Sequence, residues 1–169
     1  MKLCKYYVFI IIIFLGTGSS ICKELEEKDI IDHQVLPVAL KWKEAILKKD
    51  IKALVNFALP EDQEAVNDEL ILTKSFLHRL FFDNESNLNG KKSVYEILIN
   101  SKNIKIIKHS QLWKNANSVS VYYYDQNKID LKFPINPDKE QLLLNIGLVW
   151  KTYFFQVDDI WYTSYNYGQ

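Results

Sequence analysis

The chain has 169 residues, of which 48% are hydrophobic and 14% aromatic, and its 21 basic side chains balance 21 acidic ones. This length suits a single domain with a sizeable core. The balanced charge argues against nucleic acid or an anionic membrane surface as the main partner, because both require a basic patch.

The first twenty residues have the order of a secretory signal peptide. A basic start precedes an uninterrupted apolar run at residues 6–15, and small residues fill positions 16–20. A charged head, an apolar middle and a small-residue exit direct a protein to export. We therefore expect a periplasmic or secreted protein that is cleaved between Ser20 and Ile21, with cleavage after Ser19 as a close alternative.

Other interpretations of this segment fit less well. A membrane anchor needs about 20 apolar residues, and this run is about half as long, so no membrane span is expected once the signal is removed. The flanking lysines disfavour a buried strand or helix of the domain. A lipid anchor at Cys22 is disfavoured because Ile21, not a small residue, precedes it. Because Cys4 leaves with the signal, the mature chain keeps one thiol and forms no internal disulfide.

We expect three segments: a signal peptide at residues 1–20, a leader at 21–34, and one domain at 35–169. The leader is charged and is expected to be a short helix or an ordered segment. Within the domain, apolar residues have helical spacing up to about residue 103 and strand spacing after it. Helices followed by an antiparallel sheet are typical of an α+β fold.

Two helices are predicted at the start of the domain. The first extends to Lys49, since apolar residues recur every three or four positions at Val35, Ala39, Trp42 and Ile46. A proline fits only in a first turn, so Pro37 places the start of this helix near Leu36. Asp50 is a suitable N-cap for the second helix, Ile51–Leu59, which ends before a proline.

Two more helices are predicted before the sheet. The segment Asp68–Phe82 is apolar around most of its circumference, which indicates a helix packed on more than one side. Ser93 and Glu96 form a capping box, which predicts a short helix at Val94–Asn100.

The remainder is predicted to be antiparallel sheet. In the second strand, Ser120, Tyr122 and Tyr124 should share one face, and Val119, Val121 and Tyr123 the other. Gly147 indicates a bulge or bend, and Asp158-Asp159 a turn. The predicted strands are Asn103–Ser110, Ser118–Asp125, Ile129–Phe133, Gln141–Val157 and Ile160–Tyr167.

The residues that often carry chemistry form no recognisable catalytic set. His78 is expected on the third helix as a structural residue or a pocket base, His109 at a solvated strand end, and His33 exposed in the leader. Three separated histidines do not have zinc-ligand spacing. The acidic residues at 61–69 lack the alternation and central glycine of a calcium loop and are expected to be solvated. We assign no catalytic residue, no metal ligand and no cofactor, and binding residues are not identified.

Two segments resemble a known superfamily. Residues 38–54, with Trp42 and a Lys-Lys-Asp step between two helices, resemble the opening helix pair of nuclear-transport-factor-like domains. Residues 154–165, with a short turn followed by Trp161-Tyr162, are similar to their closing hairpin. These domains include ketosteroid-isomerase-like and SnoaL-like proteins, and the resemblance implies a cone of helices on a strongly curved sheet enclosing a pocket.

The resemblance does not imply a reaction, because this fold hosts enzymes, carriers and interaction modules. The isomerase's Tyr and Asp pair has no counterpart on the opening helices, which carry Trp42 and Phe57 instead. Aromatic residues crowd the predicted sheet, and Tyr and Trp serve binding surfaces well. We therefore expect a non-catalytic module that binds an unknown protein or a small apolar ligand. A hydrolase or isomerase using His78 or a Tyr is the alternative, and a homodimer through the outer sheet face is possible.

Overall fold

The computed structural model describes residues 31–60, 62–63, 70–83, 92–113 and 116–165, in two units that meet between Gln34 and Val35. The predicted signal peptide, its cleavage between Ser20 and Ile21, and Cys22 lie outside the described residues, as does most of the leader. The leader's last residues, 31–34, are helical, and His33 is exposed as expected.

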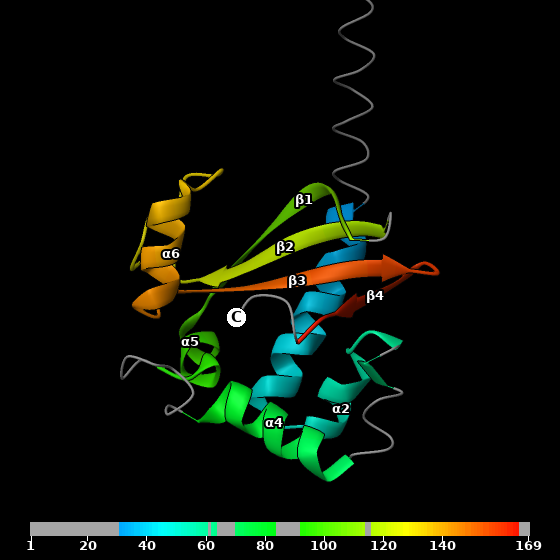
Figure 1. The fold of residues 1–169 in the computed structure, drawn as a ribbon. Coiled ribbons are helices and arrows are strands. Elements are labelled where there is room, and N and C mark those ends of the chain that lie inside the picture. The colour runs from blue at the N-terminus through cyan, green and yellow to red at the C-terminus, as the bar shows by residue number, and fades with distance from the viewer. Residues whose placement is uncertain (1–30, 61, 64–69, 84–91, 114–115, 166–169) are drawn as a thin grey trace, which may run out of the picture. The chain divides into compact units, whose positions relative to one another are not determined.

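The unit from Val35 on is an α+β domain, as predicted (Figure 1). Its four strands form one antiparallel sheet in the order in which they occur in the chain. The strands are β1 (Asn103–Trp113), β2 (Ala116–Tyr124), β3 (Val149–Val157) and β4 (Ile160–Thr163). The helices with bounds within the described residues are α2 (Ile51–Asn56), α4 (Leu70–Phe82), α5 (Val94–Asn100) and α6 (Pro137–Asn145).

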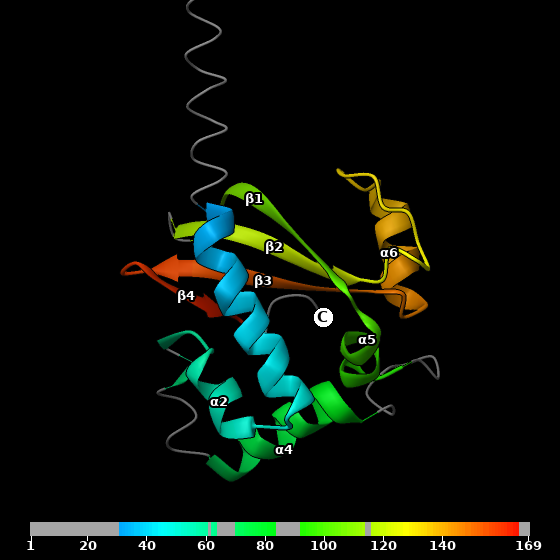
Figure 2. The same ribbon diagram turned by 180° about the vertical axis from the view of Figure 1, so that it is seen from behind.

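The helix before α2 covers residues 31–47, so the predicted start near Leu36 is wrong. Pro37 lies inside it and removes one backbone hydrogen bond, a loss that helices in proteins tolerate when packing outweighs it. Here the packing is extensive, because the four residues of the predicted stripe are fully buried. They are Val35, Ala39, Trp42 and Ile46. Figure 2 shows this helix lying across one face of the sheet.

The second helix begins as predicted, since the Asp50 side chain accepts a hydrogen bond from the Ala53 N–H at 2.9 Å. It ends at Asn56, three residues earlier than predicted. Its end joins the sheet: the Thr163 N–H donates to the Phe57 carbonyl at 2.7 Å, and Ala58 forms a bridge with Thr163. Pairing with β4 thus replaces the last predicted helical turn.

The predicted capping box of α5 is confirmed. The Ser93 N–H donates to Glu96 Oε2 at 2.9 Å, and the Glu96 N–H donates to Ser93 Oγ at 3.2 Å. At the other end of α5, Lys43 Nζ donates to the Ser101 carbonyl at 2.5 Å. A cation is favourable there because the helix dipole is negative at its C-terminus.

Strand β2 alternates as predicted and separates the two faces of the sheet. The Tyr123 hydroxyl donates to the Ala39 carbonyl of the 31–47 helix at 3.0 Å, which identifies the inner face. Tyr122 packs on the opposite, outer face, in a small core with Leu143 of α6 and Val149. Helices therefore contact both faces, and α6 lies on the outer one.

Two predicted strand segments are wrong. Residues 129–133 form no strand but an irregular segment, and the first half of the predicted Gln141–Val157 strand is helix α6. The Asn136 side chain caps α6 by accepting from the Asp138 N–H at 3.0 Å, and Pro137 occupies the first turn. These two helix-start signals decide the structure here, although the alternating apolar residues that follow them are typical of a strand.

Gly147 ends this helix instead of forming the predicted strand bulge. Its φ of +65° is the left-handed conformation that glycine adopts after a helix, with the Leu148 N–H bonded to the Leu143 carbonyl at 3.1 Å. The predicted Asp158-Asp159 turn is confirmed, with φ of 49° and 63°. The last strand ends at Thr163, not at Tyr167, whose placement lies outside the described residues.

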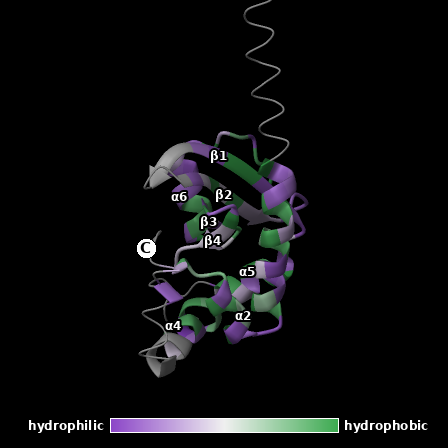
Figure 3. Ribbon diagram, turned by 90° about the vertical axis from the view of Figure 1, so that its right-hand side faces the viewer, coloured by the Kyte–Doolittle hydropathy of each residue, from purple (hydrophilic) through white to green (hydrophobic). Residues whose placement is uncertain are grey.

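Aromatic rings fill the space between the inner face and the helices. The Trp42 ring centroid lies 5.7 Å from Phe81, 5.6 Å from Tyr123 and 6.2 Å from Phe154. Phe81 in turn packs on Tyr165 at 5.5 Å. We call these five residues the inner-face core. Figure 3 shows how hydrophobic and hydrophilic residues alternate along the elements around it.

Candidate functional site

The outer face of the sheet carries polar and aromatic side chains beside α6. The register places Ser120 opposite Tyr153 and Tyr122 opposite Lys151. We call the group the outer-face cluster. Its members are His109 on β1, Ser120 and Tyr122 on β2, Lys151 and Tyr153 on β3, and Glu140 on α6.

Glu140 joins α6 to the sheet. Its Oε1 accepts from Lys151 Nζ at 2.6 Å, and its Oε2 accepts from the Tyr122 hydroxyl at 2.8 Å. The side chains of Lys151 and Glu140 are only 14% and 20% exposed. Hydrogen bonds to an ionised carboxylate in such a partly buried position are strong, so Glu140 fixes the orientation of both partners.

Lys151 lies between two tyrosine rings. Its Nζ is 5.4 Å from the Tyr122 ring centroid and 4.9 Å from that of Tyr153, both within the range of cation–π attraction. Burial by itself would lower the pKa of Lys151, but interactions with Glu140 and Tyr153 raise this pKa above its usual value. The ammonium is therefore charged at any physiological pH.

His109 contacts the buried hydroxyl of Ser120, with Nε2 and Oγ 2.6 Å apart. Its ring also packs near Tyr153 at 6.1 Å. Burial lowers the pKa of His109, and the charge of Lys151 lowers it further, although Glu140 acts in the opposite direction. The imidazole is therefore neutral at pH 7. Among the described residues no group hydrogen-bonds its Nδ1, which leaves this atom to a partner.

Two titratable groups of the cluster, Tyr122 and Lys151, keep one protonation state at physiological pH. Burial, followed by the hydrogen bond to Glu140, raises the pKa of Tyr122 to about 12, so this phenol stays protonated. Acid–base catalysis needs a group whose pKa lies near the working pH, and neither Tyr122 nor Lys151 meets this condition. Ser120 is 0% exposed, so its hydroxyl is out of reach of a substrate carbonyl.

The described aromatic residues of the inner face are closely packed. Trp42, Tyr123 and Phe154 are each 0% exposed. Burial raises the pKa of Tyr123 and of Tyr165, whose hydroxyls donate to backbone carbonyls. A recess of about 10 Å³ at the α5 end of the domain has room for one water molecule. It is lined by Lys92, Glu96, Ile97, Asn100, Ser101, Asp125, Lys128, Gly147 and Leu148.

His78 and His109 lie on different elements of the domain. His78 is on α4 as predicted, but its side chain is 57% exposed and lies 3.4 Å from Asp83, so it is not a pocket base. His109 was expected at a solvated strand end, and it lies instead inside β1 with a buried partner. Among the described residues, no three His, Cys, Asp or Glu side chains are grouped to hold a metal ion. Most of the acidic residues at 61–69 lie outside them.

The sequence did not identify Glu140 and Lys151 as site residues. Glu140 was placed before a long strand, whereas α6 brings it onto the outer face. The alternation of residues along β3 does place Lys151 and Tyr153 on one face. This pattern was the signal in the sequence that could have grouped these two members of the cluster.

No helix within the described ranges is long and apolar enough to cross a membrane. Comparison of the chain with protein-family models, characterised proteins and solved structures gave no significant match.

Proposed function

We propose that this chain is an exported, non-catalytic interaction module that binds a partner protein through the outer face of its sheet. The observation that carries the proposal is the outer-face cluster. It presents Tyr153, His109 and Lys151, all partly exposed, and hydrogen bonds orient the last two. Aromatic side chains and charged groups that are already ordered suit a protein interface, because little entropy is lost when they bind.

The packing on the inner face favours a protein partner over a small apolar ligand. In the nuclear-transport-factor-like domains that the sequence resembles, a ligand would enter between the helices and the sheet. We propose that this chain shares that superfamily's fold and fills the corresponding space with the inner-face core. Trp42 contributes most to the filling, since its ring contacts Phe81, Tyr123 and Phe154.

The alternative, a hydrolase or isomerase, has one observation in its favour. A histidine hydrogen-bonded to a serine hydroxyl is the pairing that activates a nucleophile. However, Ser120 is fully buried, and the carboxylate of the cluster, Glu140, is bonded to Lys151 and Tyr122 and has no described bond to His109. The pair therefore supports a fixed imidazole better than it supports catalysis.

The experiment first captures a binding partner of the exported chain from the extracellular or envelope fraction of the cells that produce it. It then compares surface variants of the chain in their binding to that partner. The captured protein is identified with the wild-type chain, and its binding is then measured with Tyr153→Ala and with Tyr95→Ala, a matched tyrosine on α5. We expect Tyr153→Ala to weaken binding about tenfold or more, as for an interface anchor, and Tyr95→Ala to leave it unchanged. Equal effects of both variants would contradict the proposal.

Two further measurements separate the remaining parts of the proposal. Mass spectrometry of the exported chain should find Ile21 as its first residue, and a retained N-terminus would contradict export by cleavage. Hydrolysis of model esters that disappears in Ser120→Ala, with folding unchanged, would overturn the non-catalytic part. A captured second copy of the chain would identify the partner as the chain itself.

A further inference from the structure

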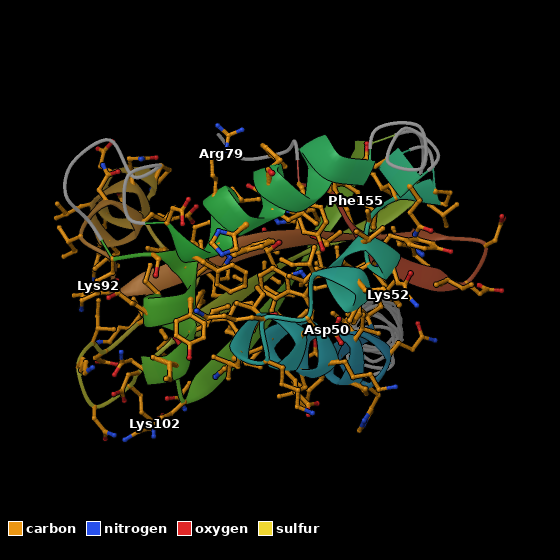
Figure 4. The ribbon with its side chains drawn as sticks, turned by 90° about the horizontal axis from the view of Figure 1, so that it is seen from below. Asp50, Lys52, Arg79, Lys92, Lys102 and Phe155 are labelled. Carbon is orange, nitrogen blue, oxygen red and sulfur yellow. The ribbon has the colours of Figure 1, made fainter. Side chains whose placement is uncertain are left out.

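Two aromatic rings on the helical side of the domain form a pair away from the outer-face cluster. Phe82 ends α4 and Tyr95 lies in the first turn of α5. Their ring centroids are 5.9 Å apart and their planes are inclined at 61°. Both rings are partly exposed, and His78 packs on Phe82 at 5.3 Å. Figure 4 views this side of the molecule, with α4 and α5 in green.

The chain's own ammonium group occupies this pair. Lys49 Nζ lies 5.4 Å from the Phe82 ring centroid and 5.2 Å from that of Tyr95. Both distances are within the range of about 6 Å at which a cation is attracted to an aromatic face. The faces of both rings are thus turned toward the same position, which the ammonium of Lys49 occupies.

The ammonium of Lys49 is exposed and has no acceptor among the described residues. No carboxylate or carbonyl among the described residues accepts a hydrogen bond from Lys49 Nζ, whereas Lys48 beside it pairs with Glu44 at 2.6 Å. A primary ammonium has three N–H groups, which at this exposed position donate to water and must stay hydrated. A methylated ammonium has no such need and gains apolar contact with the rings. The pair therefore suits a methylated ammonium better than the lysine that occupies it.

The ammonium of Lys49 can also move away from the two rings. The long side chain of this lysine is exposed. No ion pair within the described ranges holds the ammonium against the rings. A competing cation would displace only the two ring contacts.

We infer that Phe82 and Tyr95 form a binding site for a methylated ammonium group, the chemistry of choline and of phosphatidylcholine headgroups, and that Lys49 is the chain's own competitor for it. The site is independent of the proposed outer-face function.

The experiment titrates choline chloride into the exported chain and follows the ring resonances of Phe82 and Tyr95 by NMR, with sodium chloride at equal ionic strength as the reference. We expect saturable shifts at millimolar choline, the affinity typical of a small cation at a two-ring site. Lys49→Gln should tighten binding several-fold, and Phe82→Leu combined with Tyr95→Leu should abolish it.

The matched control is Lys52→Gln, an exposed lysine on α2 that Figure 4 labels on the same side, and it should leave binding unchanged. Circular dichroism confirms that each variant is folded. Phosphatidylcholine vesicles form the second arm: binding that choline displaces would assign the headgroup as the source. The inference is overturned if choline produces no saturable shift in the wild-type chain or in Lys49→Gln, or if Lys52→Gln has the same effect as Lys49→Gln.

Discussion

The two faces of the sheet place the same residue types in different surroundings. Adjacent residues of β2 illustrate the difference: Tyr123 is fully buried against Trp42, while Tyr122 bonds Glu140 beside a lysine. On the inner face, aromatic rings contact one another and exclude water, so they stabilise the fold. On the outer face, aromatic rings lie beside the ammonium of Lys151, and we propose that a partner binds there. Strand alternation alone makes this division.

The difference between the faces also explains why α6 lies on the outer face of the sheet, away from the other helices. The 31–47 helix buries a fully apolar stripe against the inner face, whereas α6 contacts the sheet through Leu143 and the carboxylate of Glu140. Substitutions on the inner face should therefore change stability most, and substitutions on the outer face should change binding or local charge.

The largest expected effect is that of Trp42→Ala. Removing this ring leaves a cavity between Phe81, Tyr123 and Phe154, and we expect the free energy of unfolding to fall by about 3–5 kcal/mol. Urea denaturation followed by circular dichroism measures it. Tyr153→Ala on the outer face is the comparison and should lose less than about 1 kcal/mol. Similar losses in the two variants would remove the distinction between the faces.

Glu140→Ala should have the next largest effect. It leaves the Lys151 ammonium and the Tyr122 hydroxyl without their acceptor in a mostly buried position, and we expect a loss of about 2 kcal/mol in the free energy of unfolding. Asp138→Ala, in the same helical turn but exposed, is the control and should lose about 0.5 kcal/mol. Lys151→Met added to Glu140→Ala should recover part of the loss. A Glu140→Ala chain as stable as Asp138→Ala would mean that α6 is not held by this carboxylate.

Asp159→Gly should stabilise the domain slightly. Asp159 has a φ of 63° in the two-residue turn between β3 and β4, a conformation in which glycine is free of the strain that other residues bear. We expect a gain of roughly 1 kcal/mol, measured by thermal unfolding. Ser120 and the rest of the outer-face cluster should be unaffected, and a destabilised variant would show that the aspartate side chain itself is needed.

The smallest expected effect is a change in the pKa of His109. Burial and the charge of Lys151 lower this pKa below the ordinary 6.5. The folded chain therefore binds fewer protons than the unfolded one, and this contribution to stability is present above pH 6.5 and is lost as the pH falls through the folded pKa. Lys151→Met should raise the pKa of His109, because Glu140 then acts unopposed. An NMR titration of the imidazole protons measures it, and an unchanged pKa would contradict the cluster's electrostatics.

Local signals in the sequence predicted the parts of the fold that depend on local structure. The capping box predicted the start of α5, and the alternation of β2 assigned Tyr122 and Tyr123 to opposite faces. The errors occur where two patterns overlap. Residues 141–148 alternate like a strand, but Asn136 and Pro137 start a helix, and capping decides the structure of so short a segment.

The outer-face cluster was beyond prediction for a different reason. Its members come from four elements, and their proximity depends on the register between strands and on the docking of α6, neither of which local periodicity specifies. His109 and Ser120 illustrate this, since neither residue has a neighbour in sequence that points to the other. Sequence alone therefore predicted a binding module in general terms, and the geometry located the cluster on which the proposed surface rests.

The measurement that tests the central claim most directly is site-specific photocrosslinking in the living cell. A photoreactive amino acid is placed at position 153 on the outer face and, in a second strain, at position 52 on the helical side. We predict one discrete crosslinked partner from position 153, absent from position 52 and lost when Lys151→Ala is added. Crosslinks that are the same from both positions, or that occur only from position 52, would contradict the claim that the outer face is the binding surface.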